Sequence, residues 1–226
     1  QYNGLMQSEP ESEIPLFESA ANFGTRDIVP MDWLIGMMIP AGTVTLLSGD
    51  GGTGKSLLAL NLAISVATGG ALPWLGMQPE QGPALYVGAE DDTNEMHRRI
   101  NNMIWNRPDL NYSDLSDLHI ASLAARDALL SVVDARTNTL APSPLFEQVR
   151  SKIDAVRPRV VIFDTLADLF PGNENDRAQA RQFVGQLRKL SVDFSTTIIL
   201  LSHPSLSGMA SGTGTSGNTA WNNSVR

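Results

Sequence analysis

One segment constrains the fold of this chain more than any other, and it reads Gly49-Asp50-Gly51-Gly52-Thr53-Gly54-Lys55-Ser56. It matches the phosphate-loop pattern G-x-x-x-x-G-K-[ST] at every specified position. An aliphatic and β-branched run at 44–48 predicts a strand before it, and good helix formers follow from Leu57. A strand, a glycine turn and a helix N-terminus direct backbone N–H groups at one point, which suits a polyphosphate anion. The sequence therefore predicts a nucleoside triphosphate site.

The predicted site has a role for each kind of residue in the segment. The glycines allow positive φ angles and a close approach of backbone to phosphate. Lys55 is expected to reach the β- and γ-phosphates, and Ser56 to hold a magnesium ion. The alternative is a glycine-rich turn that carries Lys-Ser by chance. The predicted ATP-binding residues are Gly49, Asp50, Gly51, Gly52, Thr53, Gly54, Lys55, Ser56 and Leu57.

Composition limits the class of protein. With 226 residues, the chain can form one α/β domain with a substantial core. The absence of cysteine excludes disulfides and thiolate metal sites. No apolar run has the length of a membrane span and no signal peptide opens the sequence, so we expect a soluble cytoplasmic protein. The net charge of -8 implies that any contact with nucleic acid is local.

The order of apolar runs predicts the organisation of the chain. Residues 1–27 are expected to form a flexible acidic segment, and residues 28–226 the globular domain. The apolar stretch 28–40 is either a lid on the edge of the core or a contact with nucleotide or subunit through Trp33 or Met37-Met38.

Strands alternate with helices through the rest of the sequence. This alternation predicts an α/β fold with a mainly parallel central sheet and helices on both faces. A Ser-, Gly- and Thr-rich stretch at 203–218 is expected to be a mobile loop. The expected strands are 44–48, 83–89, 119–122, 129–133, 160–163 and 196–202, and the expected helices begin near 57, 93, 144 and 178.

Polar residues follow three further predicted strands, where ligands of parallel sheets bind. Asp164 ends an apolar run, as a magnesium-binding Walker B strand requires, although many strands end in Asp. Glu90 is the candidate general base, with Asp91 or Asp92 as substitutes; alternatively, it is a helix N-terminal acid. His203 is a candidate γ-phosphate contact or an ordinary loop histidine.

These motifs together resemble the RecA-like P-loop ATPases, and among them the RepA-type hexameric replicative helicases of phages and plasmids, often described as AAA-family ATPases. The resemblance covers about 30–226. The residues that carry it are the segments 47–56, 85–92, 161–166, 200–204 and 216–221.

The resemblance implies a magnesium-dependent ATPase that assembles as a homo-oligomeric, hexameric ring and acts on single-stranded DNA in replication. It places catalytic roles on Glu90, Lys55, His203 and Arg226, and metal binding on Ser56 and Asp164, with Arg226 reaching the neighbouring subunit's nucleotide. Arg226 is otherwise a charged chain end.

Other implications concern the loops and the end of the chain. The loops 172–177 and 205–218 match DNA-facing pore loops, although the first holds Glu174 and Asp176 and the second has no basic residue. The sequence ends where such proteins continue with another strand, so we expect a C-terminally truncated fragment. The rival functions are a nucleotide-switched regulatory or assembly ATPase without helicase activity, and an ATP-binding scaffold.

Overall fold

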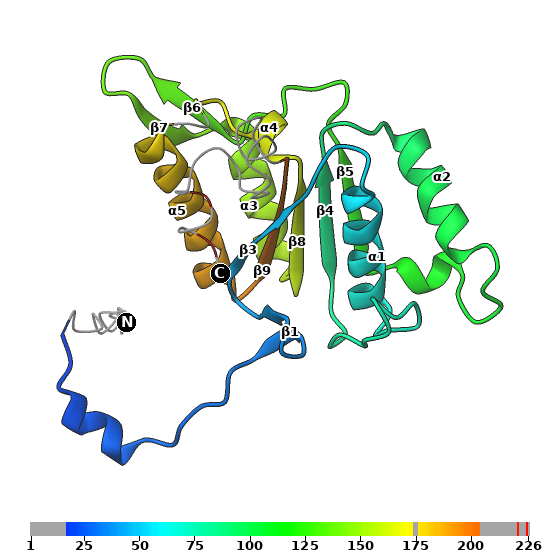
Figure 1. Cartoon of the computed structure of the whole chain (residues 1–226), viewed down its shortest axis with the longest axis horizontal. Helices are drawn as coiled ribbons and strands as arrows, with labels where there is room; N and C mark the ends of the chain where they lie inside the picture. The colour runs from blue at the N-terminus through cyan, green and yellow to red at the C-terminus, as the bar shows by residue number, and fades with distance from the viewer. Residues whose placement is uncertain (1–16, 174–175, 204–220, 222–224, 226) are drawn as a thin grey trace, which may run out of the picture. The chain divides into compact units, whose positions relative to one another are not determined.

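The computed structural model describes residues 17–173, 176–203, 221 and 225 (Figure 1). The chain divides into two compact units, residues 1–31 and residues 32–226. Within the first unit, residues 17–31 contain a short 3-10 helix, η1 (Ala20–Thr25), which the composition did not predict. The Ser19 hydroxyl caps this helix by accepting a hydrogen bond from the backbone N–H of Ala21, and none of the helix residues is buried.

The second unit is built on a sheet of five parallel strands (Figure 1). The middle strands are buried at every residue, which explains why their sequences are continuously apolar rather than alternating. The spatial order of the strands is β3 (Val44–Ser48), β9 (Thr197–Ser202), β8 (Val160–Asp164), β4 (Ala84–Gly88) and β5 (Leu118–Ser122).

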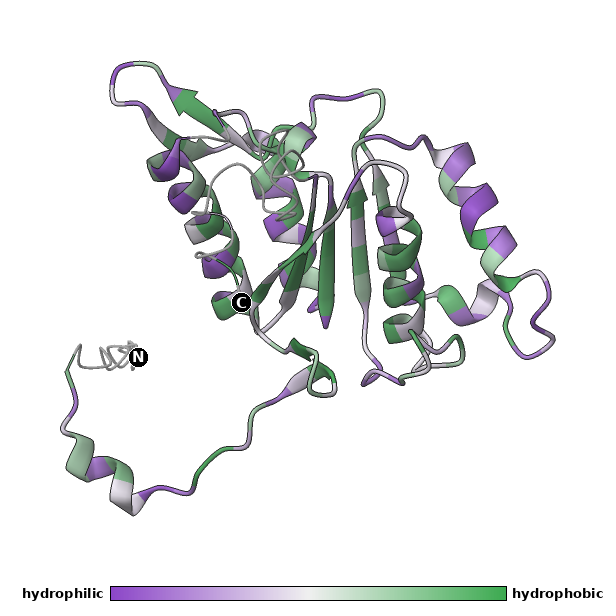
Figure 2. Cartoon of the chain, viewed as in Figure 1, coloured by the Kyte–Doolittle hydropathy of each residue, from purple (hydrophilic) through white to green (hydrophobic). Residues whose placement is uncertain are grey.

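Helices cover both faces of the sheet, as the sequence predicted. Two hydrophobic clusters result, because successive side chains of a strand point to opposite faces. In β8, Val160 and Ile162 belong to one cluster, whereas Val161 and Phe163 belong to the other. Figure 2 shows the apolar colouring of these central strands. The first cluster includes residues of α1 (Lys55–Ala67) and α2 (Thr93–Ile104), and the second includes residues of α3 (Pro144–Val156) and α5 (Arg177–Phe194).

Local sequence signals explain where these helices begin. The Asp92 side chain caps α2 by accepting from the backbone N–H of Glu95. Ser143 caps α3 in the same way, with Pro144 as the first helical residue. Asp176 caps α5, accepting from two backbone N–H groups. Asp176, one of the two acidic residues of the predicted pore loop 172–177, therefore has a structural role at a helix N-terminus.

Several small elements were not predicted. The stretch 129–133 was expected to be a strand, but the strand is β6 (Ser131–Asp134), which pairs antiparallel with β7 (Thr139–Pro142) outside the central sheet. A short helix, α4 (Leu166–Leu169), follows β8. Residues 28–40 include a second hairpin, β1 (Trp33–Ile35) with β2 (Ile39–Pro40).

The β1–β2 hairpin packs on the core, as the interpretation of 28–40 as a lid on the edge of the core predicts. Leu34, Ile35 and Ile39 are buried in the hydrophobic cluster of the α1 face. Met37 and Met38 are exposed instead of buried. Neither methionine lines the cleft at the phosphate loop.

No helix in the described part of the chain combines the length and the apolarity that crossing a bilayer requires.

Candidate nucleotide-binding site

The order of the strands brings the predicted site residues to one edge of the sheet. Because β3, β9, β8 and β4 are neighbours and parallel, their carboxyl ends lie side by side. The segments that follow these ends are the phosphate loop, His203, Asp164 with Thr165, and Glu90, in that spatial order. Two backbone hydrogen bonds tie neighbouring ends together, from Gly49 N to Ser202 O (3.3 Å) and from Ala89 N to Asp164 O (2.7 Å).

The phosphate loop has the backbone conformation that its glycines predict. Gly52 has a φ of 74° and Gly54 a φ of 86°, and both values lie in the left-handed region that favours glycine. Gly54 caps α1 with no side-chain hydrogen bond, so the helix begins at Lys55 directly after the turn. The loop is braced by Thr53, whose hydroxyl donates to the Asp50 carbonyl at 2.7 Å. A helix N-terminus thus opens onto the cleft, with its first N–H groups available to an anion.

Lys55 lies at the centre of this edge. Its side chain is mostly buried, and its ammonium donates to the carbonyls of Gly49 (2.5 Å) and Asp50 (2.8 Å). The Nζ atom also lies 3.4 Å from Nδ1 of His203, which connects the phosphate loop to the end of β9. A flexible ammonium held by loop carbonyls and one imidazole nitrogen can exchange these acceptors for phosphate oxygens.

The acidic triplet after β4 divides into three roles. Asp92 caps α2, and Asp91 forms an ion pair with Arg99 at 2.5 Å. Burial raises the pKa of Asp91, and the positive charge of Arg99 opposes this shift. Glu90 is exposed, lines the cleft and has no hydrogen bond or ion pair within the described residues. Of the three carboxylates, Glu90 alone is thus left free to act on a ligand in the cleft.

Asp164 is buried at the end of β8, and its two carboxylate oxygens differ. Oδ2 accepts a hydrogen bond from the Tyr86 hydroxyl at 2.5 Å. Oδ1 is buried and has no hydrogen-bond partner in the described part of the chain. Burial and the neighbouring Asp164 carboxylate raise the pKa of the Tyr86 hydroxyl, so Tyr86 stays a donor. The tyrosine hydroxyl also approaches the Ser56 carbonyl at 3.5 Å, which links β4 and β8 to the start of α1.

These residues fit a magnesium ion. An orphaned carboxylate oxygen of Asp164 and the hydroxyl of Ser56 are oxygen donors of the kind that Mg²⁺ prefers. The described residues contain no cluster of three or more His, Asp or Glu side chains that could hold a metal alone. This is compatible with magnesium, because that ion is typically bound by one or two protein ligands together with substrate phosphates.

A cleft of about 260 Å³ lies at this edge. It is lined by several predicted site residues, namely Gly52, Gly54, Lys55, Ser56, Leu57, Glu90 and His203. Arg99 and Thr165 also line it, and the sequence did not single them out. Arg99 is held by Asp91 and by Glu95, whose Oε1 lies 3.0 Å from the arginine Nε. The only signal for Arg99 was its position on the helix that follows the acidic triplet.

The comparison with known families decides the class of this protein. Residues 8–209 match the family model described as "AAA domain". The chain belongs to the AAA domain family. The family, the parallel sheet and the phosphate loop together identify the general class of this chain. It is a nucleotide-binding RecA-like P-loop ATPase.

Two similar proteins are consistent with this class. The AAA domain is 23% identical over 189 residues to the DNA repair protein RadA of Synechocystis sp.. That alignment covers 80% of the chain and 32% of RadA, so the chain spans about a third of this relative's length. The fold is shared with a KaiC-like protein from the archaeon Pyrococcus horikoshii OT3, with a TM-score of 0.53 and 19% identity over 85% of this chain and 72% of that chain.

Two predicted features of the AAA domain lie outside the described residues. Arg226 is one of them. The loop predicted at 203–218 is the other, apart from His203 itself, and the pore loop predicted at 205–218 lies within it.

The Tyr86–Asp164 bond yields the first testable prediction. Replacing Tyr86 with phenylalanine removes the donor to a buried carboxylate, and a hydrogen bond to a charged group contributes about 1.5–3 kcal/mol. We expect the free energy of unfolding, measured by urea denaturation, to fall by about that amount. Tyr112→Phe is the matched control, because Tyr112 is 47% exposed. Equal effects of the two substitutions would contradict the role assigned to the Tyr86 hydroxyl.

Proposed function

We propose that this protein hydrolyses ATP at the phosphate-loop cleft, as a ring of identical subunits that moves on single-stranded DNA. One observation carries the proposal: four neighbouring strand ends bring Lys55, Ser56, His203, Asp164 and Glu90 to one edge of the sheet. A cation, a metal-binding pair and a free carboxylate at one edge are the groups that phosphoryl transfer to water requires. We assign this domain to residues 28–226.

The proposed chemistry follows from the positions of these groups. Lys55 exchanges its carbonyl acceptors for the β- and γ-phosphate oxygens and stabilises their negative charge. Glu90 accepts a proton from the water that attacks the γ-phosphorus, while the ADP oxygen leaves on the opposite side. His203 lies beside Lys55 Nζ and contacts the γ-phosphate. When hydrolysis removes the γ-phosphate, His203 transmits this change to the segment that follows β9. Magnesium, when bound by Ser56 and Asp164, neutralises further phosphate charge.

In the proposed ring, a neighbouring subunit contributes an arginine to each nucleotide site. In this proposal Arg226 of one subunit reaches the nucleotide of its neighbour and stabilises the transition-state charge. Hydrolysis then depends on assembly, so specific activity rises with protein concentration. The family resemblance supports this part of the proposal.

A pair of arginines supports a local contact with DNA. Arg177 and Arg181 begin α5, and both are exposed without an ion pair in the described part of the chain. Residues four apart lie on the same side of a helix, so the two guanidinium groups are neighbours. Cations are disfavoured at a helix N-terminus by the helix dipole, so their presence suggests a partner that carries negative charge. The name of the relative RadA, a DNA repair protein, agrees with this partner.

The acidic charge of the chain favours a second candidate function. With a net charge of -8, most of the surface repels DNA, which suits a nucleotide-switched regulatory or assembly ATPase that does not unwind DNA. In that case the arginines of α5 contact a protein.

DNA stimulation of hydrolysis separates the two functions. We expect oligo(dT) to increase steady-state ATP hydrolysis severalfold, and rising salt to remove the effect because phosphate contacts release counterions. The variant Arg177→Gln/Arg181→Gln should bind oligo(dT) more weakly, with the slope of log K against log salt reduced by about 1.4. Lys189→Gln, on the same helix and exposed, should behave as wild type. A rate of ATP hydrolysis that oligo(dT) does not change would support the regulatory function instead.

A further inference from the structure

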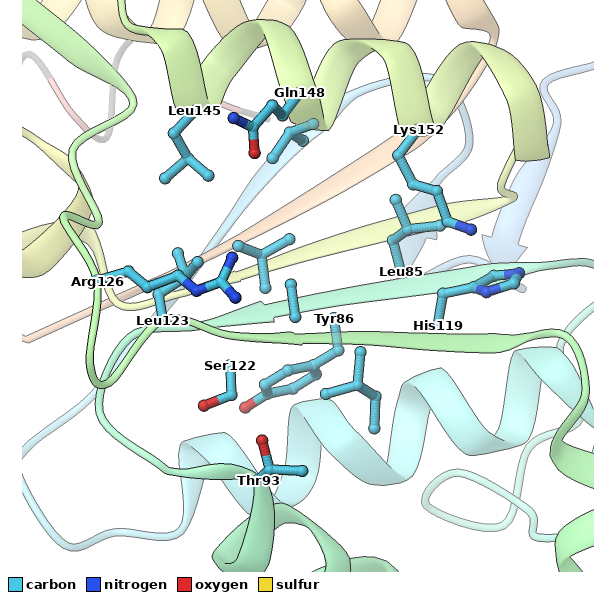
Figure 3. A pocket seen from close by; sticks show the side chains of 14 residues that line it. Leu85, Tyr86, Thr93, His119, Ser122, Leu123, Arg126, Leu145, Gln148 and Lys152 are labelled. Carbon is cyan, nitrogen blue, oxygen red and sulfur yellow. The ribbon is translucent and has the colours of Figure 1, made fainter.

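A second and larger pocket lies away from the phosphate loop, beside the edge strand β5 (Figure 3). Its volume is about 410 Å³, within the range of small-molecule sites. It is formed by β4, β5, the loop after β5 and the side of α3 that faces them. None of the described residues that we assign to ATP hydrolysis lines this pocket.

The charge of the pocket is opposite to that of the chain. Arg126 and Lys152 line it, and neither forms an ion pair with a carboxylate in the described residues. Among the described residues no Asp or Glu side chain lines it, although the chain has 24 acidic residues against 16 basic ones. His119 lies beside Lys152 (Figure 3). Burial and the charge of Lys152 lower the pKa of His119, so this imidazole is neutral at pH 7 and offers a hydrogen bond rather than a charge.

The two cations lie at opposite ends of the pocket. Figure 3 shows Arg126 at one end, Lys152 and His119 at the other, and Leu145 and Gln148 of α3 above and nearer to Arg126. Apolar side chains also line the pocket, among them Leu85 of β4 and Leu145 and Val149 of α3.

We propose that this pocket is a binding site for a small organic anion, which carries a phosphate, sulfonate or carboxylate group on an apolar body. Arg126 and Lys152 bind acidic groups at the two ends. The amide of Gln148 offers a further hydrogen bond, and the apolar body packs on α3. Two cations without acidic partners in a pocket that apolar side chains also line would bind water and counterions in the free protein, and an amphipathic anion replaces both favourably.

The pocket is also connected to the candidate general base. Ser122, at the end of β5, lines the pocket, and its hydroxyl donates to the Asp91 carbonyl at 2.7 Å. Thr93 also lines it, and it begins α2 three residues after Glu90. Ser122 and Thr93, which Figure 3 shows on the side of the strands away from α3, thus join the lining of the pocket to the segment 90–93. We infer that binding of a ligand in the pocket changes the rate of ATP hydrolysis; this step rests on the proposed function, whereas the binding site does not.

The probe for the site is anilinonaphthalene sulfonate, an aromatic anion whose fluorescence increases in apolar surroundings. We expect the full chain, without nucleotide, to bind the probe at one saturable site. Arg126→Gln and Lys152→Gln should each weaken binding about tenfold, because each removes a charge-assisted contact. Arg150→Gln is the matched control, because it removes one positive charge from α3, the helix that carries Lys152. Arg150 pairs with Glu147 and does not line the pocket.

Three results would overturn the site. The first is wild-type affinity in both pocket variants, and the second is equal weakening by Arg150→Gln. The third is displacement of the probe by ATP together with loss of binding in Lys55→Ala, which would place the probe in the phosphate-loop cleft. Displacement by oligo(dT), lost in the pocket variants, would show that the pocket binds the DNA backbone instead of a small anion.

The connection to Glu90 has its own readout. Saturating probe should change steady-state ATP hydrolysis at least twofold in wild type and in Arg150→Gln, but not in Arg126→Gln/Lys152→Gln. Intact probe binding with unchanged hydrolysis would overturn the connection and leave the site. Absence of hydrolysis in every variant would overturn the proposed function, and probe binding would still decide the site.

Discussion

Replacing Lys55 with alanine is expected to reduce ATP hydrolysis by about 100-fold or more, because the variant loses the cation that faces the transferred phosphate. In the free protein the ammonium is held by two loop carbonyls, next to His203. In the described part of the chain, no other lysine or arginine lines the cleft except Arg99, which two carboxylates already engage. Substitution of Lys55 therefore leaves no cation that is free to replace it among the described residues.

The measurement combines nucleotide binding with turnover. A fluorescent ATP analogue should bind the Lys55→Ala protein at least about tenfold more weakly than wild type, a loss equivalent to about 1.4 kcal/mol. Lys189→Ala is the matched control, since Lys189 is an exposed lysine on α5 in a surface ion pair with Asp193. Circular dichroism of both variants verifies that they fold. Wild-type turnover in Lys55→Ala would place hydrolysis elsewhere on the molecule and contradict the assigned cleft.

The sequence was sufficient to predict the main architecture. The phosphate-loop pattern and four apolar runs predicted strands that the structure contains, and the positions of Asp92 and Pro144 predicted two helix starts. These signals are local, because capping and burial periodicity act within a few residues. The rule that ligands bind at the carboxyl ends of parallel strands then brought Glu90, Asp164 and His203 to the same edge.

Some features of the sheet edges and of the site were not predicted. The β6–β7 hairpin has four-residue strands, and only β6 has an apolar pattern that suggests a strand. Tyr86 looked like an ordinary core residue, because its hydroxyl meets Asp164 only when β4 lies next to β8. Arg99 reaches the cleft because α2 packs beside α1 and Asp91 holds its guanidinium. The Tyr86–Asp164 contact is set by the order of the strands, which the sequence does not show directly.

The substitution Glu90→Gln is expected to separate binding from chemistry. Glu90 lines the cleft without an internal partner, so its replacement by an amide of the same shape leaves the fold and the phosphate contacts unchanged. The amide cannot accept the proton of the attacking water, and loss of a general base typically costs about 10²–10⁴ in rate. We therefore expect single-turnover hydrolysis to fall by that factor, while the affinity for a fluorescent ATP analogue stays within about threefold of wild type.

The neighbouring carboxylates make this prediction specific to Glu90. Asp91→Asn weakens the pairing with Arg99, and Asp92→Asn retains a capping side chain, so both should keep most of the activity. Glu147→Gln is the exposed control for loss of one negative charge. If Asp91→Asn abolishes hydrolysis and Glu90→Gln does not, Asp91 is the base, and its raised pKa becomes part of the mechanism. If Glu90→Gln loses ATP binding as well, Glu90 positions the nucleotide or its metal rather than the attacking water.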